Sequence, residues 1–390
     1  MNKSNVLVVT RNLPPLVGGM ERLIWHVLDE LRQDYKVHVV GPKGCKNRLP
    51  QDVSGIEVQL KPMVLFLLRA GLCALWSALR LRPTIIFAGS GLTAPIVWII
   101  ARLLRCKCGV YLHGLDVCAQ HPVYQLLWVP LFRHFDAVIV NSHYTKQLAI
   151  KAKVPASCIS ILHPGVKIPA MDYGNAGRLS FRSRHGFGSS PLLLYVGRIT
   201  PRKGLLPFID NILQHIVAEI PTVMLVVIGG APINALQTAT DEYAAAGSAL
   251  KKKGLAAKVC FLGSCTDEEL DAAYFAADIL VFPVQENAYD IEGFGMVAIE
   301  AAAHGLPTVA FAVGGVPDAV SHGSSGKLIL SGDNIAFAKA VVKYINDEKT
   351  PDQSEACKHF AQLFAWNVFG DKLRKIFRSV TNGSASLANI

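Results

Sequence analysis

The sequence predicts an α/β protein built from two halves, each with its own parallel sheet. Short runs rich in Val, Ile and Leu alternate with helix-like segments along the whole chain, which is the pattern of successive βαβ units. A stretch rich in Gly, Ser and Arg over 171–190 separates two sets of strand-like runs. At 390 residues the chain is long enough for two or three domains with separate cores. We therefore expect two Rossmann-like, doubly wound domains facing a central cleft, with ligands bound at the carboxyl ends of the strands.

The expected strands are short, apolar and bounded by turn residues. In the first half they are 5–10, 36–40, 84–88, 108–112, 137–140 and 159–162. In the second half they are 191–196, 222–228, 258–262, 279–282, 307–311 and 327–330.

Composition excludes two classes of protein. With 51% hydrophobic and 17% charged residues, the chain is too apolar for an intrinsically disordered protein. The cysteines number nine, an odd count for a disulfide framework, and a chain this long does not depend on one. Cys106 and Cys108 have no second pair at zinc-site spacing, so buried free thiols are expected. The N-terminus runs directly into the first strand, and we expect no signal peptide.

Charge is unevenly distributed along the chain. Residues 1–170 hold 20 Lys+Arg and 8 Asp+Glu, a balance of +12, which leaves 19 and 21 for residues 171–390, a balance of −2. No acidic residue occurs between Glu57 and Asp116. This asymmetry favours an anionic partner for the first half, either nucleic acid or a lipid surface, although a solvated basic face has the same composition. No nucleic-acid-binding module and no interleaving of basic and aromatic residues is present, which argues against nucleic acid.

Two apolar stretches require comparison with membrane spans. Residues 83–101 contain Pro and Gly and predict a buried strand, a glycine turn and a helix. Residues 63–82 are interrupted by Arg69 and Arg80, so neither stretch is expected to span. The second has apolar residues at helical spacing, which fits an interfacial helix and a core helix about equally. These apolar residues are Leu65, Leu68, Leu72, Leu75, Trp76 and Leu79.

Two glycine- or histidine-containing turns follow expected strands of the first half. Gly18 and Gly19 precede a helix, where backbone N–H groups can approach a phosphate, although a simple tight turn has the same sequence. His113 and Asp116 follow the strand 108–112, where His can donate to a substrate hydroxyl and Asp can orient it. A single His in such a position is more often structural.

Two further segments of the second half carry cations and carboxylates. The loop GRITPRKG presents Arg198 and Lys203 after a strand, a geometry suited to a diphosphate, although a solvated loop has a similar composition. Glu292 precedes a helix that begins near Gly295, and Glu300 follows eight residues later among apolar neighbours, where its charge needs a partner. The N–H groups at 294–297 are expected to point out of the helix N-terminus toward phosphate or sugar oxygens.

Together these motifs resemble the family 4 GT-B glycosyltransferases, which are retaining enzymes that use nucleotide sugars and include the phosphatidylinositol mannosyltransferases. The match covers residues 6–330 in the family's order, and its most specific part is the E-x7-E pair in EGFGMVAIEAAAHGLPTVAF. Asn141-Ser142 before Lys146 also matches. The resemblance implies domains over 1–171 and 172–364, with a last helix over 365–390 that returns to the first domain.

The resemblance also implies a role for each matched residue. Arg198 and Lys203 would bind the donor diphosphate and stabilise it as leaving group, without a metal or other cofactor. Glu300 would hold the ribose. His113 would lie near the sugar and Gly19, after Gly18, near the phosphate. The remaining expected donor-site residues are Gly229, Glu292, Gly293, Phe294, Gly295, Met296 and Val297.

The expected function is therefore metal-independent, retaining transfer of a hexose from a nucleotide sugar to a lipid-linked, polysaccharide or lipopolysaccharide acceptor. GDP-mannose is slightly favoured as donor. UDP-glucose, UDP-galactose or a UDP-N-acetylhexosamine on the same scaffold is the alternative, and an epimerase or phosphorylase is a more distant one. Specificity is expected in loops 229–234, 263–266 and 286–292. The absence of Asp-x-Asp leaves no anchor for a Mg²⁺-dependent mechanism. The sequence indicates a peripheral enzyme on the cytosolic face of a bacterial inner membrane, with no indication of oligomeric state.

Overall fold

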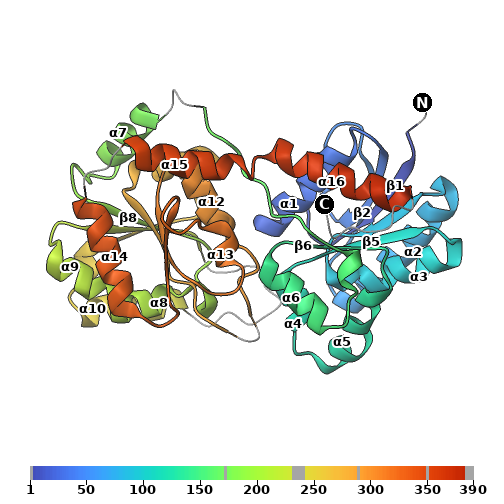
Figure 1. Cartoon of the computed structure of the whole chain (residues 1–390), viewed down its shortest axis with the longest axis horizontal. Coiled ribbons are helices and arrows are strands. Elements are labelled where there is room, and N and C mark those ends of the chain that lie inside the picture. Colours follow the sequence, from blue (N-terminus) through green and yellow to red (C-terminus); the bar gives the residue numbers. More distant parts are fainter. Residues whose placement is uncertain (1–2, 171–173, 231–241, 288–289, 348–350, 383–390) are drawn as a thin grey trace. The chain divides into compact units, whose positions relative to one another are not determined.

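The computed structural model describes residues 3–170, 174–230, 242–287, 290–347 and 351–382. The chain divides into two compact units (Figure 1). Unit 1 comprises Met1–Gly165, Ala288–Gly293 and Trp366–Ile390, and unit 2 comprises Val166–Asn287 and Phe294–Ala365. The boundary expected between residues 171 and 172 lies outside the described residues.

Unit 1 is built on a seven-stranded parallel sheet with the order β3-β2-β1-β4-β5-β6-β7. Its strands are β1 (Asn5–Val9), β2 (Lys36–Pro42), β3 (Ser54–Val58), β4 (Ile85–Ala88), β5 (Lys107–Leu112), β6 (Ala137–Val140) and β7 (Ile159–Ile161). Strand β4 is buried over its whole length, as expected for a central strand covered on both faces. The edge strand β3 is the one strand of this sheet that the sequence did not predict, because it is half-exposed and contains Ser54, Gly55 and Glu57.

Helices cover both faces of this sheet. They are α1 (Gly19–Leu31), α2 (Met63–Leu81), α3 (Ala94–Leu104), α4 (Gly114–Cys118), α5 (Pro122–Leu127), α6 (His143–Lys151) and α16 (Trp366–Thr381). Alternate residues of β1 enter two different cores, because successive side chains point to opposite faces of a strand. Val6 and Val8 pack with residues of α1 and α16, whereas Leu7 and Val9 pack with residues of α2 and α3.

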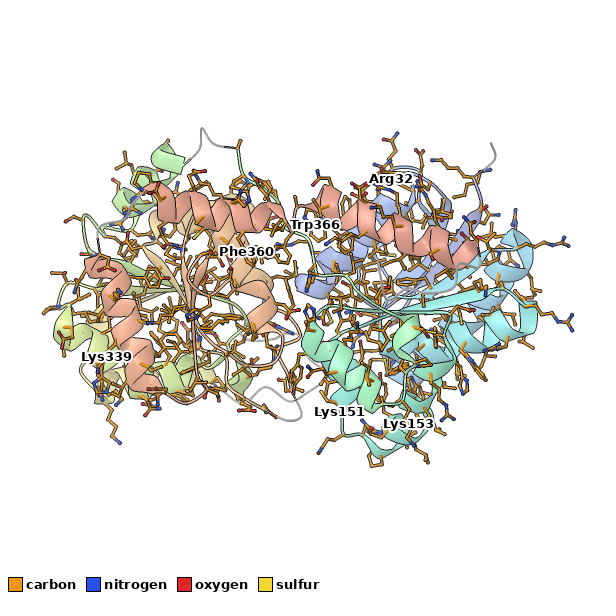
Figure 2. The ribbon with its side chains drawn as sticks, in the orientation of Figure 1. Arg32, Lys151, Lys153, Lys339, Phe360 and Trp366 are labelled. Carbon is orange, nitrogen blue, oxygen red and sulfur yellow. The ribbon has the colours of Figure 1, made fainter. Side chains whose placement is uncertain are left out.

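The last helix, α16, packs on α1 and so completes unit 1 with the end of the chain. Arg374 forms an ion pair and hydrogen bond with the buried carboxylate of Glu30, and Trp366 stacks on His26 with ring centroids 3.6 Å apart. Gly370 permits this close approach, because a Cβ there would lie 2.0 Å from Glu30 Oε2. Figure 2 labels Phe360 on the preceding helix and Trp366 at the start of α16. The returning last helix predicted from the sequence is therefore confirmed.

Unit 2 contains a six-stranded parallel sheet with the order β10-β9-β8-β11-β12-β13. Its strands are β8 (Leu192–Val196), β9 (Met224–Ile228), β10 (Val259–Gly263), β11 (Ile279–Phe282), β12 (Thr308–Phe311) and β13 (Gly326–Ile329). Its helices are α7 (Gly174–Arg184), α8 (Leu205–Phe208), α9 (Gln214–Glu219), α10 (Glu242–Lys252), α11 (Asp267–Ala276), α12 (Met296–Ala303), α13 (Val316–Ala319), α14 (Asn334–Asn346) and α15 (Pro351–Gln362). All six strands predicted for this half are present.

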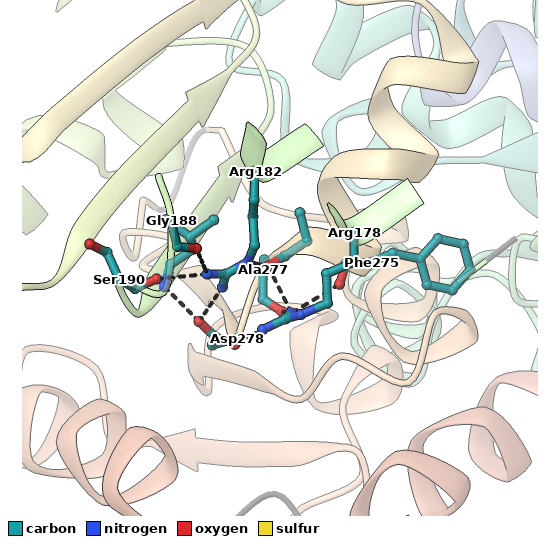
Figure 3. A network of polar contacts seen from close by, with 9 residues as sticks. Arg178, Arg182, Gly188, Ser190, Phe275, Ala277 and Asp278 are labelled. Atoms are coloured by element: carbon teal, nitrogen blue, oxygen red, sulfur yellow. Dashed lines mark hydrogen bonds and ion pairs between the residues drawn. The ribbon is translucent and has the colours of Figure 1, made fainter. Parts of the chain in front are cut away.

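A polar network attaches α7 to the end of α11 (Figure 3). Arg178 donates hydrogen bonds to the carbonyl oxygens of Phe275, Ala276 and Ala277, which supply partners that the C-terminal end of a helix lacks. Arg178 and Arg182 both form ion pairs with Asp278, at 3.0 and 2.8 Å. Arg182 also donates to Gly188 and Ser190 carbonyl oxygens. The network therefore joins the first helix of unit 2 to the strand ends of its sheet.

Replacing Arg182 with Met should destabilise unit 2 by about 2–3 kcal/mol, because the change removes the ion pair with Asp278 Oδ2 and the hydrogen bonds to the Gly188 and Ser190 carbonyl oxygens, while Arg178 still pairs with Asp278. Urea unfolding followed by circular dichroism measures the change. The matched control is Arg184→Met, because Arg184 is exposed and lies 3.7 Å from Glu269; its loss should cost about 1 kcal/mol or less. Equal effects of the two substitutions would contradict a structural role for the network.

Candidate active site

The carboxyl ends of β8 and β9 meet through backbone hydrogen bonds in unit 2. Gly197 N–H donates to Ile228 O at 3.0 Å, Ile199 N–H to Gly230 O at 3.2 Å, and Gly229 N–H to Gly263 O at 2.7 Å. These loops lie where open parallel sheets bind their ligands. Gly197 and Gly229 are thus neighbours in space, although they are 32 residues apart in the sequence.

Two positions in this region accept only glycine. Gly229 has φ +130°, and a Cβ there would lie 2.0 Å from the carbonyl oxygen of Gly197. Gly204 has φ +73°, and a Cβ there would lie 1.9 Å from the carbonyl oxygen of Pro283. L-residues rarely adopt these backbone conformations, and the neighbouring atom is rigid backbone in both cases. Glycine therefore allows the loops after β8, β9 and β11 to approach one another closely.

Lys203 and Arg198 belong to the loop that follows β8. Lys203 ends the 3₁₀ turn Pro201–Lys203 and is half-buried, with Nζ 5.0 Å from the ring centroid of Phe282. Its chain passes near the start of the same loop, because a Cβ on Gly197 would lie 3.7 Å from Lys203 Cε. Arg198 is exposed. The loop thus carries one half-buried and one exposed cation five residues apart in the sequence.

Helix α12 begins as the sequence predicted. Gly295 occupies the N-cap position with φ +104°. As a glycine it has no side chain that could cap the helix. The first N–H groups of an α-helix have no partner inside the helix, so those of Met296 and Val297 are available to an anion. Gly295 and Phe294 are buried, whereas Met296 and Val297 are partly exposed.

Glu300 is held in place by groups that the sequence analysis did not identify. The hydroxyl of Tyr274 donates to Glu300 Oε2 at 2.9 Å. His304 stacks on Tyr274 with ring centroids 5.0 Å apart, and its Nδ1 lies 2.7 Å from the carbonyl oxygen of Glu300. On its other side His304 Nε2 lies 3.3 Å from Asp271, and this contact holds the pKa of the Asp271 carboxyl below its usual value. The partner expected for the half-buried Glu300 is therefore Tyr274.

In unit 1, His113 is buried at the carboxyl end of β5. Its ring stacks on Tyr111 with centroids 5.0 Å apart, and its Nε2 lies 3.3 Å from the carbonyl oxygen of Gly89. Asp116 accepts a hydrogen bond from the backbone N–H of His113 at 2.8 Å. Burial raises the pKa of the Asp116 carboxyl, although His113 and Arg11 oppose this rise. Asp116 therefore fixes the backbone turn that carries His113.

The loop that carries Glu292 and Gly293 belongs to unit 1 by its contacts. A Cβ on Gly293 would lie 2.6 Å from Asn141 Nδ2 and 3.2 Å from the backbone N of Gly114. The backbone of Ile291 hydrogen-bonds Cys118 in α4. The structure thus brings His113-Gly114, Asn141 and Glu292-Gly293 together. Residues 288–289 of the expected specificity loop 286–292, and 231–234 of loop 229–234, lie outside the described residues.

The carboxylate of Glu21 folds back onto the Gly18-Gly19 turn, a contact that the sequence analysis did not identify. Helix α1 begins at Gly19, one residue before the expected start at Met20. Glu21 Oε1 accepts a hydrogen bond from Asn12 at 2.8 Å, and its Oε2 lies 2.4 Å from the position of a Cβ on Gly18. A negative charge here competes with a phosphate for the helix N-terminus. Glu21, two residues after Gly19, was the available signal, because an acidic residue in the first turn commonly folds back onto it.

Comparison with known proteins agrees with this arrangement. The family model described as Glycosyltransferase Family 4 matches residues 17–168, and that described as Glycosyl transferases group 1 matches residues 178–362. The chain is 27% identical over 383 residues to a GDP-mannose-dependent alpha-(1-6)-phosphatidylinositol monomannoside mannosyltransferase of Mycolicibacterium smegmatis, covering 95% of this chain and 97% of the relative. It is 32% identical over 233 residues to a D-inositol 3-phosphate glycosyltransferase of Mycolicibacterium gilvum, covering 59% and 49%.

Solved structures give the same fold. The Anabaena Alr3699/HepE protein, crystallised in complex with UDP, superimposes with a TM-score of 0.80 at 21% identity, covering 96% of this chain and 100% of that one. Two parallel-sheet units with a returning last helix form the GT-B fold. The family models and relatives identify the chain as a glycosyltransferase that uses a nucleotide-sugar donor. The chain belongs to family 4 of these enzymes.

Gly229→Ala should destabilise unit 2 by several kcal/mol, because the added methyl group overlaps the Gly197 carbonyl oxygen as well as straining the backbone. Gly254→Ala provides the control, since Gly254 also has a positive φ (+68°) but no atom within 4 Å of the added Cβ. Backbone strain alone costs about 1 kcal/mol there. Free energies of unfolding in denaturant distinguish the two, and similar losses would refute the close approach of the two loops.

Proposed function

We propose that this glycosyltransferase transfers mannose from GDP-mannose, with retention of configuration and without a metal ion, to a lipid-linked or polysaccharide acceptor. The observation that carries the proposal is the whole-length similarity to a mannosyltransferase whose name specifies GDP-mannose and a phosphatidylinositol acceptor. The acid-free, basic segment between Glu57 and Asp116 supports an acceptor associated with an anionic surface. The enzyme would then act as a peripheral protein on the cytosolic face of a bacterial inner membrane.

In this proposal the residues of unit 2 bind the nucleotide diphosphate. Lys203 and Arg198 contact its phosphate oxygens, and the N–H groups of Met296 and Val297 complete the anion site. Glu300, oriented by Tyr274, accepts hydrogen bonds from the ribose hydroxyls. Gly229 allows the nucleotide to lie close to the backbone. The cations neutralise the charge that develops as the diphosphate leaves, which is the contribution that a divalent ion makes in other transferases.

Three residues of unit 1 are the proposed sugar ligands. Glu292 and Gly293 hold the sugar hydroxyls, and His113 lies at the reacting face. The bond between the anomeric carbon and the phosphate oxygen breaks, and a bond to the acceptor oxygen forms on the same face. The departing phosphate oxygen takes the acceptor proton, so atoms and charges balance without a side-chain base. The contribution of His113 is therefore orientation of the sugar and not proton abstraction.

A panel of nucleotides tests the donor. GDP and GDP-mannose should raise the melting temperature, whereas UDP, ADP and their hexose derivatives should raise it little, because linkage stabilises a protein only through ligands that bind its folded state. Stabilisation by UDP compounds alone would replace GDP-mannose with a UDP-hexose. Release of free sugar phosphate or of an epimer in place of a transferred sugar would indicate the phosphorylase or epimerase alternatives.

Removing the fixed cation should greatly slow transfer. Lys203→Ala is expected to reduce kcat by about 10²–10³-fold, the usual loss when one stabilising group of a leaving group or oxyanion is deleted. Glu300→Ala should abolish measurable transfer by weakening donor binding. Lys251→Ala, at an exposed position of α10, is the control and should be neutral. Near-normal turnover of both site variants, with the fold retained, would exclude this site.

Tyr274→Phe should weaken recognition of the ribose without altering recognition of the phosphates. Loss of a hydrogen bond to a charged group corresponds to roughly tenfold in affinity. Calorimetry with the preferred nucleoside diphosphate and its 2′-deoxy form separates the effects, because the wild-type preference for the ribonucleotide should shrink in the variant. An equal loss for both nucleotides would make Tyr274 merely structural. Tyr111→Phe, which removes the hydroxyl that donates to Leu162 O in unit 1, is the control.

A further inference from the structure

Helix α2 has apolar side chains on two opposite faces. One face is buried against the sheet through Phe66, Ala70, Ala74, Ser77 and Ala78. The other face is 36–71% exposed and apolar, and it consists of Val64, Leu65, Leu68, Leu72, Trp76 and Leu79. Soluble monomers rarely expose a contiguous apolar patch of this kind without a binding function. The sequence left core helix and interfacial helix as alternatives, and the structure shows features of both in the same helix.

The apolar surface continues from α2 onto α3. A Cβ on Gly71 of α2 would lie 4.0 Å from Ile96 Cγ1 of α3, so these positions mark the flanks along which the two helices pack. Ile99 and Leu103 follow Ile96 at i+3 and i+7 and therefore lie on the same side of α3. They are 50% and 66% exposed. The exposed leucines of α2 and α3 thus form one surface on both sides of the helix–helix contact.

Arg102 lies on the side of α3 that faces the turn Val129–His134 and not α2. Its Nη2 donates a hydrogen bond to the carbonyl oxygen of His134, 3.2 Å away, in the turn Val129–His134. Arg102 and Leu103 are consecutive and point about 100° apart around the helix. Leu103 is therefore directed toward α2, and Arg102 toward the neighbouring turn. We call the exposed apolar residues of α2 and α3 the apolar platform.

Exposed arginines border the platform. Arg80 and Arg82 lie at the end of α2, Arg105 at the end of α3, and Arg69 on the flank of α2 away from Gly71. The guanidinium of Arg80 lies 5.4 Å from the ring centroid of Trp76, so a cation and an interfacial aromatic residue are joined at one end of the platform. None of these arginines forms an ion pair within the described residues. An apolar surface that only cationic side chains border is complementary to an anionic lipid surface, because the apolar groups can enter the headgroup region while the cations contact lipid phosphates.

The same contacts exclude a membrane-spanning arrangement of α2. By length and composition it is the one helix in the described part of the chain that could cross a membrane, and 28% of its apolar window is buried. The buried face, however, packs on β1 and the neighbouring strands of a sheet whose other face carries α1 and α16. Lipid cannot surround a helix that forms one layer of a folded domain. Any contact of α2 with lipid is therefore along the bilayer surface.

We propose that the apolar platform of α2 and α3 binds an anionic bilayer, with its leucines inserted below the headgroups and its arginines in contact with lipid phosphates. This inference deepens the proposed function, since it supplies the surface by which a peripheral glycosyltransferase reaches a lipid-linked acceptor. It also adds α3 to the contact, so the bound domain rests on two parallel helices and its sheet has a fixed inclination to the bilayer.

Vesicle flotation of the full chain tests the platform. The wild-type protein should float with vesicles of phosphatidylcholine containing phosphatidylglycerol and should bind pure phosphatidylcholine weakly. Leu72→Gln and Leu103→Gln should each lower the binding constant by about tenfold, because each removes one inserted apolar side chain. Arg80→Glu with Arg82→Glu should abolish binding to the anionic vesicles at low salt. The matched controls are Leu330→Gln, 78% exposed in unit 2, and Lys251→Glu, and both should bind normally.

Other outcomes would overturn the inference. Loss of binding in Leu72→Gln with no change in Leu103→Gln would reduce the contact to α2 alone. Unchanged flotation in all platform variants, together with a wild-type dimer in sedimentation that Leu72→Gln dissociates, would make the platform an interface between copies. Nucleotide-induced thermal stabilisation distinguishes this failure from failure of the proposed function. A protein that binds GDP-mannose but never vesicles contradicts only the platform, and one that binds vesicles but no nucleotide sugar contradicts only the proposed function.

Discussion

The candidate site of unit 2 depends on how closely backbone segments approach one another at the ends of parallel strands. The loops after β8 and β9 meet where Gly229 lies against the Gly197 carbonyl group, and Gly204 meets the chain after β11 in the same way. These contacts fix the path of the loop that presents Arg198 and Lys203. A side chain at either position would push the loops apart and would shift the loop that carries both cations. Backbone packing therefore places the loop whose cations are the proposed diphosphate ligands.

Much of this arrangement could be predicted from local sequence. Buried parallel strands have continuous apolar runs, so twelve strands were identified, whereas the half-exposed β3 has no such run. The glycines and charged residues of the site were recognisable because they lie within short segments. Tyr274 was not, because its partner Glu300 is 26 residues away and the two meet only when α11 and α12 pack. Glu21 was overlooked for another reason: its place in the first turn is visible in the sequence, but its contact with Gly18 depends on its rotamer.

Helix α2 shows how one segment satisfies two apparently competing interpretations. Its small residues, Ala70, Ala74 and Ala78, allow the helix to lie close to the sheet, while larger leucines occupy the outer face. A core helix normally has this size distribution reversed, with large residues inside and polar residues outside. The outer face therefore contributes little to folding stability, and its composition is free to serve binding.

The network around Asp278 has a consequence for the independence of unit 2. Because α7 contributes both arginines that neutralise this carboxylate, the sheet of unit 2 is electrostatically incomplete without a helix that precedes its first strand. Any fragment designed to isolate unit 2 must therefore include α7, even though the parallel sheet itself begins at Leu192. The electrostatically complete unit is thus longer than the sheet it contains, and the order in which the chain is synthesised delivers the two arginines before the carboxylate that they neutralise.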